Sequence, residues 1–435
     1  MAQTVIPFML PKITKLKKII YLGHAATTPV DGRVLAAMKP FWSEKFGNPS
    51  SLYQLGREAK EAVTIARQGI AKLIHAKPSE IIFTAGGSES VSLAIFGVAR
   101  NHRQILNSPA HLITSKIEHH CVINSFKALA GEGYKTSFVD VSHEGLINIE
   151  QLKKAVRPET ILISVMLANN EIGTIQPIAE IGKWLRGLNK ERLARGYSKI
   201  VFHTDACQGA GFLDLNVEKL GVDLMSVNGS KIYGPKQTGF LYVRSGINIA
   251  PLVYGGGQER GLRSGTENVA GIAGLAKAFE LAYNDREKEN KRLIALRDYL
   301  IKKISDGISA SLLNGPDDSA LKARTKSHRE NNPSTRLIRR LPNNINFSFP
   351  GVEGESLMLY LDSYGFAVST GSACSTGSLD EPSHVLTAIG RSKAQAESSI
   401  RFSLGKANTK SDLDKLIKIL PQLVKELKKV SKIDN

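Results

Sequence analysis

The stretch VDLMSVNGSKIYG, residues 222–234, passes from an apolar run into a turn rich in glycine and serine that carries Lys231. The same order, a short β-branched run, a polar or glycine-rich turn and then a helical stretch, recurs in EIIFTAGGSES (80–90), HLITSKIEHH (111–120), TILISVMLANNEIG (160–173), KIVFHTDACQG (199–209) and GFLYVRSG (239–246). Strands that alternate with helices predict parallel βαβ units and an α/β fold. The turns then meet at the carboxyl ends of the strands, where open α/β sheets bind ligands.

A second region follows Gly274. A long charged helix is predicted there, then two strand-like segments, NNINFSF (343–349) and GFAVST (365–370). A helix from Thr409 is indicated by apolar residues at helical spacing and by Thr409 and Asp412, which have the spacing of a capping box. We expect a large α/β domain at residues 31–280 and a smaller α+β domain formed by residues 1–30 and 281–435, a division that suits a chain of 435 residues.

Composition excludes several classes of protein. The chain is 42% hydrophobic and 23% charged, as in globular enzymes rather than disordered chains. Its three cysteines, Cys121, Cys207 and Cys374, are odd in number and far apart, so we expect free thiols and a cytoplasmic location rather than a disulfide framework. No apolar run approaches the length of a membrane span, and we expect no contact with membranes.

The net charge of +18 raises the question of nucleic-acid binding. Seven lysines and arginines against one acid, Glu330, fall between Leu321 and Arg340. That stretch lacks apolar periodicity and is predicted to be a solvated basic insertion at about 320–342. The stretch has no interleaved aromatic residues, no zinc-ligand spacing and no helix-turn-helix pattern, so we expect no direct nucleic-acid binding. The alternative role for the insertion is to dock an acidic partner.

Chemistry-bearing residues gather on the predicted strand rim. The turn after one strand carries Lys231, two other strands end in HTDACQ and ANNEIG, and TAGGSES turns into a helix whose first N–H groups can bind a phosphate. A lysine for a Schiff base, an aspartate for a pyridinium nitrogen and an anion cradle together predict a pyridoxal 5'-phosphate site. The rim residues are Lys231, Asp205, Gln208, Asn169, Asn170, Gly86, Gly87 and Ser88.

With these residues in view, the sequence resembles the cysteine desulfurases of the class V, fold-type I pyridoxal-phosphate enzymes, especially the type that serves iron-sulfur cluster assembly. The resemblance runs from about Ile20 to Gly405 through AATTPVDGRV, FGNPSS, NNEIGTIQPI, GSKIYGPKQTG, GGGQERGLRSGT, VEGESL, GSACS and SSIRFSLG. It implies a fold-type I transferase whose large domain holds a mostly parallel seven-stranded sheet beside a smaller α+β domain. Three positions depart from the family pattern: Gly23 where aspartate is usual, Ser230 where histidine is common and Ser92 where asparagine is frequent. The loop that carries Cys374 is also about one residue longer than usual.

The resemblance also implies roles for the rim residues. Lys231 would form the Schiff base and transfer the proton at the substrate's α-carbon. Asp205 would pair with the ring nitrogen, Gln208 with the ring hydroxyl, and His119 would stack on the ring as a catalytic residue. The phosphate would be held by Gly87, Ser88, Asn228, Ser230 and by Thr266 of the other subunit of a homodimer.

The remaining implied roles concern the substrate. Arg401, helped by Asn170, would bind the carboxylate of L-cysteine, because a guanidinium meets a carboxylate with two parallel hydrogen bonds. Cys374 would be the nucleophile that takes the sulfur as a persulfide and releases L-alanine. We expect Cys121 to lie at the start of a helix beside His119. We expect Cys207 to be a small buried side chain that fills space near the sheet.

We expect the persulfide to pass to iron-sulfur scaffold proteins or sulfur carriers, including those of tRNA thiolation. No resident metal is expected, and Cys374 would contact an iron-sulfur cluster only on a partner. Two alternatives stay open: a selenocysteine lyase or another class V activity, and an inactive scaffold that docks partners through its basic insertion.

Overall fold

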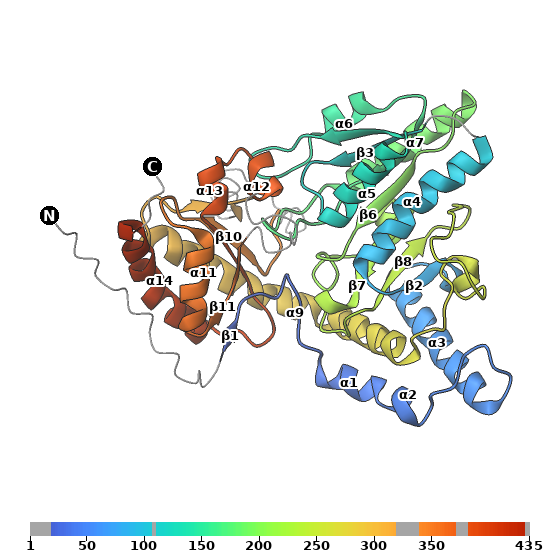
Figure 1. Cartoon of the computed structure of the whole chain (residues 1–435), viewed down its shortest axis with the longest axis horizontal. Helices are drawn as coiled ribbons and strands as arrows, with labels where there is room; N and C mark the ends of the chain where they lie inside the picture. The colour runs from blue at the N-terminus through green and yellow to red at the C-terminus, as the bar shows by residue number, and fades with distance from the viewer. Residues whose placement is uncertain (1–18, 107–109, 319–338, 371–381, 431–435) are drawn as a thin grey trace, which may run out of the picture.

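The computed structural model describes residues 19–106, 110–318, 339–370 and 382–430. Figure 1 shows two lobes, the larger built on a seven-stranded sheet and the smaller on a four-stranded sheet. The long helix α9 (Val269–Gly307) runs from one lobe to the other. The predicted boundary at residue 280 falls inside this helix, and the division into 31–280 and the flanking segments stays a prediction.

The large sheet confirms the expected mostly parallel arrangement. Its strand order is β2-β8-β7-β6-β5-β3-β4, and only β8 runs antiparallel to its neighbours. The strands are β2 (Ile81–Thr84), β3 (His111–Ser115), β4 (Lys135–Val139), β5 (Thr160–Ser164), β6 (Val201–Asp205), β7 (Leu224–Asn228) and β8 (Gly239–Val243).

Two strands differ from the repeating pattern read in the sequence. The expectation of parallel units is wrong for β8, because residues 229–238 between β7 and β8 are too few for the dozen or more residues of a crossover connection. The edge strand β4 was not expected, since its half-exposed KTSFV carries no continuous apolar run.

Helices bury both faces of the sheet. Alternate residues along most strands enter two separate cores, as the period of two requires, so that the neighbours Leu112 and Ile113 belong to different cores. The helices of this lobe are α1 (Gly32–Met38), α2 (Pro40–Ser43), α3 (Gln54–Leu73), α4 (Gly87–Leu106), α5 (His120–Gly131), α6 (Ile149–Ala155), α7 (Ile178–Ala194) and α8 (Val217–Leu220). Burial on both faces leaves the carboxyl ends of the strands as the place for a polar site.

The small lobe holds an antiparallel sheet of order β12-β13-β10-β9 and a parallel pair, β1 with β11. The predicted capping box begins α14, where Thr409 N donates to Asp412 Oδ2 at 2.9 Å. The elements are β1 (Ile20–Tyr21), β9 (Leu312–Leu313), β10 (Asn344–Ser348), α11 (Gly354–Ser363), β11 (Phe366–Ala367), β12 (Ser369–Thr370), α12 (His384–Ala388), α13 (Lys393–Glu397), β13 (Ser399–Ser403) and α14 (Lys410–Val430).

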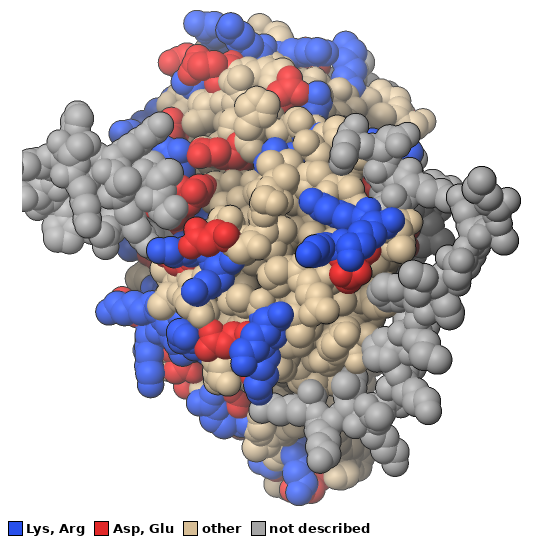
Figure 2. All heavy atoms as spheres, turned by 90° about the vertical axis from the view of Figure 1, so that its left-hand side faces the viewer, with Lys and Arg blue, Asp and Glu red and all other residues tan. Residues whose placement is uncertain are grey.

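The basic insertion lies mostly outside the described residues, which resume at Arg339. The prediction that the whole stretch is solvated is wrong for Arg340, which is 1% exposed and donates to Pro316 O at 2.7 Å and Asn314 O at 2.6 Å. The buried guanidinium thus donates to two carbonyls of the segment after β9, while its Nη1 has no hydrogen-bond partner among the described residues. Figure 2 shows that the described lysines and arginines of one face are interspersed with acids rather than gathered into one positive patch.

Over the described ranges, no helix is long and apolar enough to cross a membrane. Nor do those residues place three or more histidine, cysteine, aspartate or glutamate side chains together as metal ligands. The cytoplasmic location stays a prediction from the sequence.

Candidate active site

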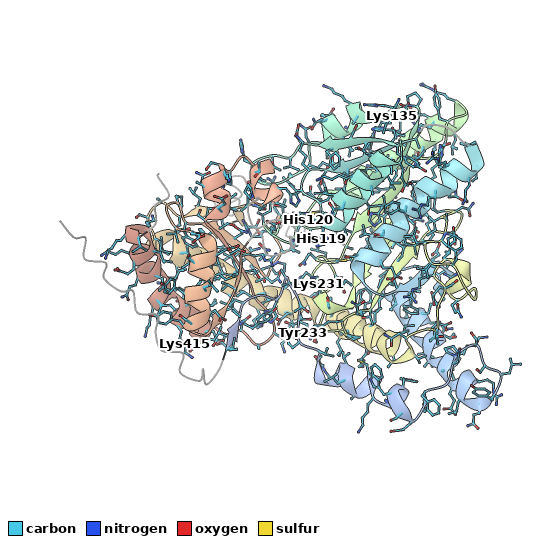
Figure 3. The ribbon with its side chains drawn as sticks, viewed as in Figure 1. His119, His120, Lys135, Lys231, Tyr233 and Lys415 are labelled. Carbon is cyan, nitrogen blue, oxygen red and sulfur yellow. The ribbon has the colours of Figure 1, made fainter. Side chains whose placement is uncertain are left out.

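A cavity of about 140 Å³ lies at the carboxyl ends of the central strands. Figure 3 shows Lys231 and His119 there, at the junction of the two lobes. Eight of the predicted site residues line it: Gly87, Ser88, His119, Asn170, Asp205, Gln208, Asn228 and Lys231. The structure therefore brings these eight residues together at one cavity, and their roles stay predictions.

Lys231 ends a short 3₁₀ turn, Gly229–Lys231, that follows β7 directly. Its Nζ donates to Ala25 O at 3.1 Å and to Ala26 O at 2.5 Å. The turn itself is capped by Asn228, whose Oδ1 accepts from Ser230 N at 3.0 Å and from Ser230 Oγ at 3.1 Å. Ser230 does not line the cavity, so its predicted role toward a phosphate is not visible in this geometry.

The N-terminus of α4, which the sequence predicts to be an anion cradle, borders the cavity. A Cβ at Gly87 would lie 2.7 Å from Cys207 Sγ and 3.3 Å from Asn228 Cβ, so only glycine lets the helix start this close to the cavity. The first N–H groups of a helix lack intrahelical acceptors, and the positive end of its dipole favours an anion. Ser88, the next residue, adds an exposed hydroxyl.

Asp205 and Gln208 come from the end of β6. Asp205 Oδ1 accepts from Cys207 N at 2.9 Å, and Gln208 Nε2 donates to Ala25 O at 2.9 Å, the same carbonyl that Lys231 contacts. Burial and then the negative charge of Asp205 raise the pKa of the Cys121 and Cys207 thiols above their ordinary value. The cavity is therefore negative on the β6 side and suits a cationic ring nitrogen.

His119 is the N-cap of α5. Its Nδ1 accepts from Cys121 N at 3.2 Å and lies 3.0 Å from Cys121 Sγ. Burial lowers the pKa of His119, although Asp205 acts in the opposite direction, so the imidazole is neutral near pH 7. The contacts of Nδ1 with Cys121 hold the ring at the start of α5, beside the cavity that it lines. Cys121 and Cys207 both line the cavity, a placement that the sequence did not suggest.

Glu118, the residue before His119, is a functional candidate that the sequence did not reveal. Its side chain is fully buried, and its Oε1 accepts from Ser115 Oγ at 2.6 Å and Met166 N at 3.0 Å, while Oε2 has no partner among the described residues. Burial, with a smaller contribution from the charge of Asp205, raises the pKa of Glu118 to about 8. The carboxyl is therefore mostly protonated at pH 7. An acid three residues after the end of an apolar strand is the only signal the sequence offers.

Arg401 lies on β13 and is 1% exposed. Its Nη1 donates to Asn170 O at 2.9 Å, whereas Nε and Nη2 have no hydrogen-bond partner in the described part of the chain. Buried guanidinium donors without acceptors are costly, and their fork geometry fits a carboxylate. Asn170 connects Arg401 to the cavity, because its side chain lines that cavity.

Among the described residues, the predicted Ser230, Arg401 and Thr266 do not line this cavity. Thr266 is exposed and lines a separate cavity of about 250 Å³ with Thr84 and Gln237. Cys374 falls in the segment 371–381, outside the described residues.

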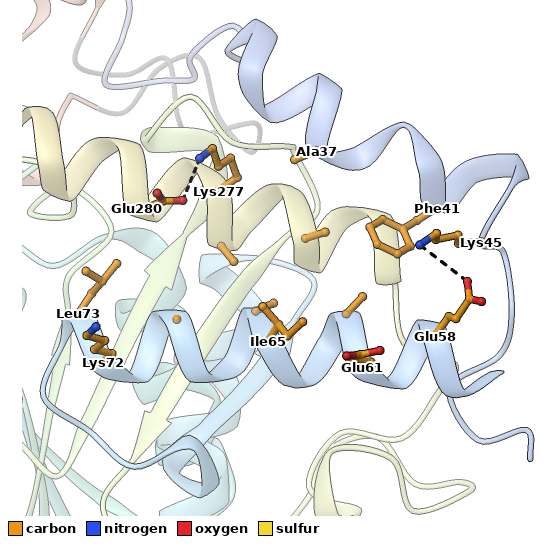
Figure 4. A pocket seen from close by; sticks show the side chains of 15 residues that line it. Ala37, Phe41, Lys45, Glu58, Glu61, Ile65, Lys72, Leu73, Lys277 and Glu280 are labelled. Atoms are coloured by element: carbon orange, nitrogen blue, oxygen red, sulfur yellow. Dashed lines mark hydrogen bonds and ion pairs between the residues drawn. The ribbon is translucent and has the colours of Figure 1, made fainter. Parts of the chain in front are cut away.

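A larger groove of about 590 Å³ shares no lining residue with the Lys231 cavity. Figure 4 shows it between α3 and α9 beside α1 and α2, lined by apolar residues such as Phe41 and Ile65. Two ion pairs also line the groove, Lys45 with Glu58 at 3.8 Å and Lys277 with Glu280 at 3.0 Å. Further apolar side chains of this part of the chain are exposed: Leu35, Trp42, Phe46, Leu52 and Tyr53.

Comparison with known proteins adds to this geometry. The family model described as aminotransferase class V matches residues 20–325 and 318–416. The chain is 49% identical over 416 residues to a protein named cysteine desulfurase IscS from Dictyoglomus turgidum, a match that covers 96% of this chain and 97% of that protein. A solved NifS-like protein superposes with a TM-score of 0.81 at 35% identity, over 94% of this chain and all of the other. A solved structure of SspA in complex with cysteine has a TM-score of 0.72 at 36% identity, over 88% of this chain and 98% of that one.

Proposed function

Because the chain belongs to the cysteine desulfurases of the class V aminotransferase family, we propose that the Lys231 cavity holds pyridoxal 5'-phosphate and that the site removes sulfur from L-cysteine. The enzyme takes L-cysteine as substrate and releases L-alanine. The observation that carries the proposal is the convergence of Lys231, Asp205 and the α4 N-terminus on one cavity.

The donors and acceptors of the cavity fit this cofactor. Lys231 would supply the amine that attaches the aldehyde carbon of the cofactor, and Asp205 a carboxylate for its ring nitrogen. The N–H groups at Gly87 and Ser88, with the Asn228 amide, would hold the phosphate, and Thr266 of a second subunit would complete the set. Gln208 would bind the ring hydroxyl, and His119 would stack on the ring. When bound, the cofactor withdraws electrons from the α-carbon of the substrate.

The chain's own residues then position the substrate and move its protons. Arg401 binds the carboxylate through Nε and Nη2, the two donors that have no protein partner among the described residues. Asn170 orients Arg401 through its carbonyl and contributes its own amide to substrate binding. Lys231 Nζ transfers the proton at the α-carbon, and the neutral His119 serves as a proton donor or acceptor beside it.

Cys374 is the proposed sulfur acceptor. Its thiolate attacks the sulfur of L-cysteine, so that a sulfur–sulfur bond forms while the substrate's carbon–sulfur bond breaks, and the carbon fragment takes up protons to become L-alanine. The two thiols in the cavity are unsuited to this role, because the pKa of Cys121 and that of Cys207 are raised by burial and by Asp205.

A homodimer with shared sites is the proposed assembly. Thr266 lies away from the Lys231 cavity of its own chain, which is consistent with a role in a partner's cavity. The exposed apolar side chains beside the α3–α9 groove, among them Trp42 and Phe46, favour burial against a second copy. The persulfide then passes to an iron-sulfur scaffold or another sulfur carrier.

The experiment that tests this function is borohydride reduction of the purified protein with pyridoxal phosphate, followed by peptide mass spectrometry. We expect the phosphopyridoxyl mass on Lys231 and no labelling in Lys231→Ala. Label on another lysine, or none in the wild type, would refute the proposed cofactor site.

A further inference from the structure

Tyr233, two residues after Lys231, has a left-handed backbone with φ +63°. This conformation is unfavourable for a residue with a Cβ and persists only where neighbouring contacts impose it. The segment 22–31, here called the N-terminal strap, supplies them. Tyr233 N donates to Thr28 Oγ1 at 2.8 Å, and Tyr233 O accepts from Asp31 N at 3.0 Å. These two hydrogen bonds fix the backbone of Tyr233 so that its side chain extends from the large lobe toward the small lobe.

The phenol of Tyr233 reaches the small lobe. Its oxygen accepts from Lys406 N at 2.7 Å, and Lys406 Nζ lies 4.9 Å from the ring centre. Burial raises the pKa of Tyr233 to about 12, so the phenol stays neutral in the working range of most enzymes. Figure 3 shows Tyr233 near Lys231 between the lobes.

Gly405 makes room for this contact. A Cβ at Gly405 would lie 2.4 Å from the Tyr233 oxygen and 2.2 Å from Cδ2 of His24. Its carbonyl accepts from Arg292 Nη2 of α9 at 2.8 Å, which fixes the turn from the other side. The Tyr233 phenol therefore meets a turn that cannot easily move away from it.

This turn follows β13, the strand that carries Arg401. The phenol thus connects the segment that bears Lys231 to the segment that bears Arg401. The strap forms a second link, since Ala25 N donates to Ser403 Oγ at 2.9 Å and Ala25 O accepts from Lys231 Nζ. An α-amino acid must present its nitrogen near Lys231 and its carboxylate to Arg401, so its affinity depends on the spacing of these two segments.

We propose that Tyr233 is a positioning residue that sets the spacing between Lys231 and Arg401 and thereby the affinity for amino-acid substrates. The proposal rests on the function proposed above. It assigns to Tyr233 no contact with the reacting atoms.

The test is a titration of the holoenzyme with L-alanine, read from the cofactor's absorbance, in wild type and Tyr233→Phe. Loss of the acceptor for Lys406 N is expected to weaken L-alanine binding about tenfold. The KM for L-cysteine rises by a similar factor while kcat changes less than about twofold. Gly405→Ala, which displaces the phenol, is expected to weaken binding in the same direction.

Tyr134→Phe is the matched control, because Tyr134 is buried and its hydroxyl donates to Ala99 O at 3.0 Å, remote from the small lobe. Unchanged L-alanine affinity in Tyr233→Phe, or an equal loss in Tyr134→Phe, would overturn the proposal. If the wild type binds no L-alanine, the proposed function fails. Amide hydrogen exchange at Lys406 in the cofactor-free protein then still tests the hydrogen bond from Lys406 N to the Tyr233 oxygen. We expect exchange there at least about tenfold faster in Tyr233→Phe alone, and unchanged exchange would overturn the link.

Discussion

Replacing Glu118 by glutamine tests the buried proton beside His119. The ordinary pKa of 4.5 is raised to about 8 in the folded protein, chiefly by burial. Because the folded state binds this proton more tightly than the unfolded state does, the contribution to stability is fully present below pH 4.5 and is lost as the pH rises to about 8. At about 1.4 kcal/mol per pH unit, the full loss is about 5 kcal/mol, of which about 3 kcal/mol has gone by pH 7.

Glutamine is isosteric with the protonated acid, accepts from Ser115 Oγ and Met166 N in the same way, and does not titrate. We therefore expect Glu118→Gln to match the wild type near pH 5 and to exceed its free energy of unfolding by up to about 3 kcal/mol at pH 7. The measurement is the urea midpoint of both proteins at intervals between pH 5 and pH 9.

Glu80→Gln is the matched control with the opposite sign. Burial opposes ionisation of Glu80, but hydrogen bonds from Lys77 N and from Ser245 hold its pKa below the ordinary value, so its contribution is lost as the pH falls. The reasoning about Glu118 is refuted if Glu118→Gln is less stable than the wild type at pH 7, or if the two proteins change in parallel from pH 5 to pH 8.

Three further predictions concern the proposed site. Arg401→Lys removes the guanidinium fork and is expected to raise the KM for L-cysteine about 100-fold in steady-state assays, whereas a rise under about threefold would exclude a carboxylate contact. Cys121 and Cys207 have thiol pKa values raised by burial and by Asp205, so iodoacetamide at pH 8 should alkylate both at least about 100-fold more slowly than free cysteine, and rapid labelling by mass spectrometry would contradict this. Gly87→Ala places a Cβ 2.7 Å from Cys207 Sγ and should weaken pyridoxal phosphate binding at least about tenfold by equilibrium dialysis, whereas an unchanged affinity would remove the α4 N-terminus from the phosphate site.

The large sheet could be predicted because its signals are local. Short apolar runs that end in polar turns identified six of the seven strands and placed Lys231, Asp205 and Asn170 on one rim. The antiparallel direction of β8 follows from the short connection between β7 and β8, which the strand pattern alone does not show. The strand β4 was missed because it lies at the edge of the sheet, and its five residues carry no signal of that position.

Features of the fold and of the site that depend on distant contacts could not be predicted. Arg340 is buried because carbonyls of a separate segment need its donors, although its neighbours in sequence are basic and polar. The raised pKa of Glu118 follows from its burial against Ser115 and Met166. The proposed role of Tyr233 follows from a backbone conformation that the strap imposes. Such properties arise from packing, so a linear pattern of residue types does not encode them.

The central claim is that the cavity around Lys231 uses Cys374 to take sulfur from L-cysteine. The most direct measurement is the release of sulfide and L-alanine from L-cysteine, with a reductant present, by the wild type and by Cys374→Ala loaded with pyridoxal phosphate. We predict equimolar sulfide and L-alanine from the wild type, and retained cofactor absorbance with at least about 100-fold less sulfide from the variant. Undiminished sulfide release by Cys374→Ala would contradict the account.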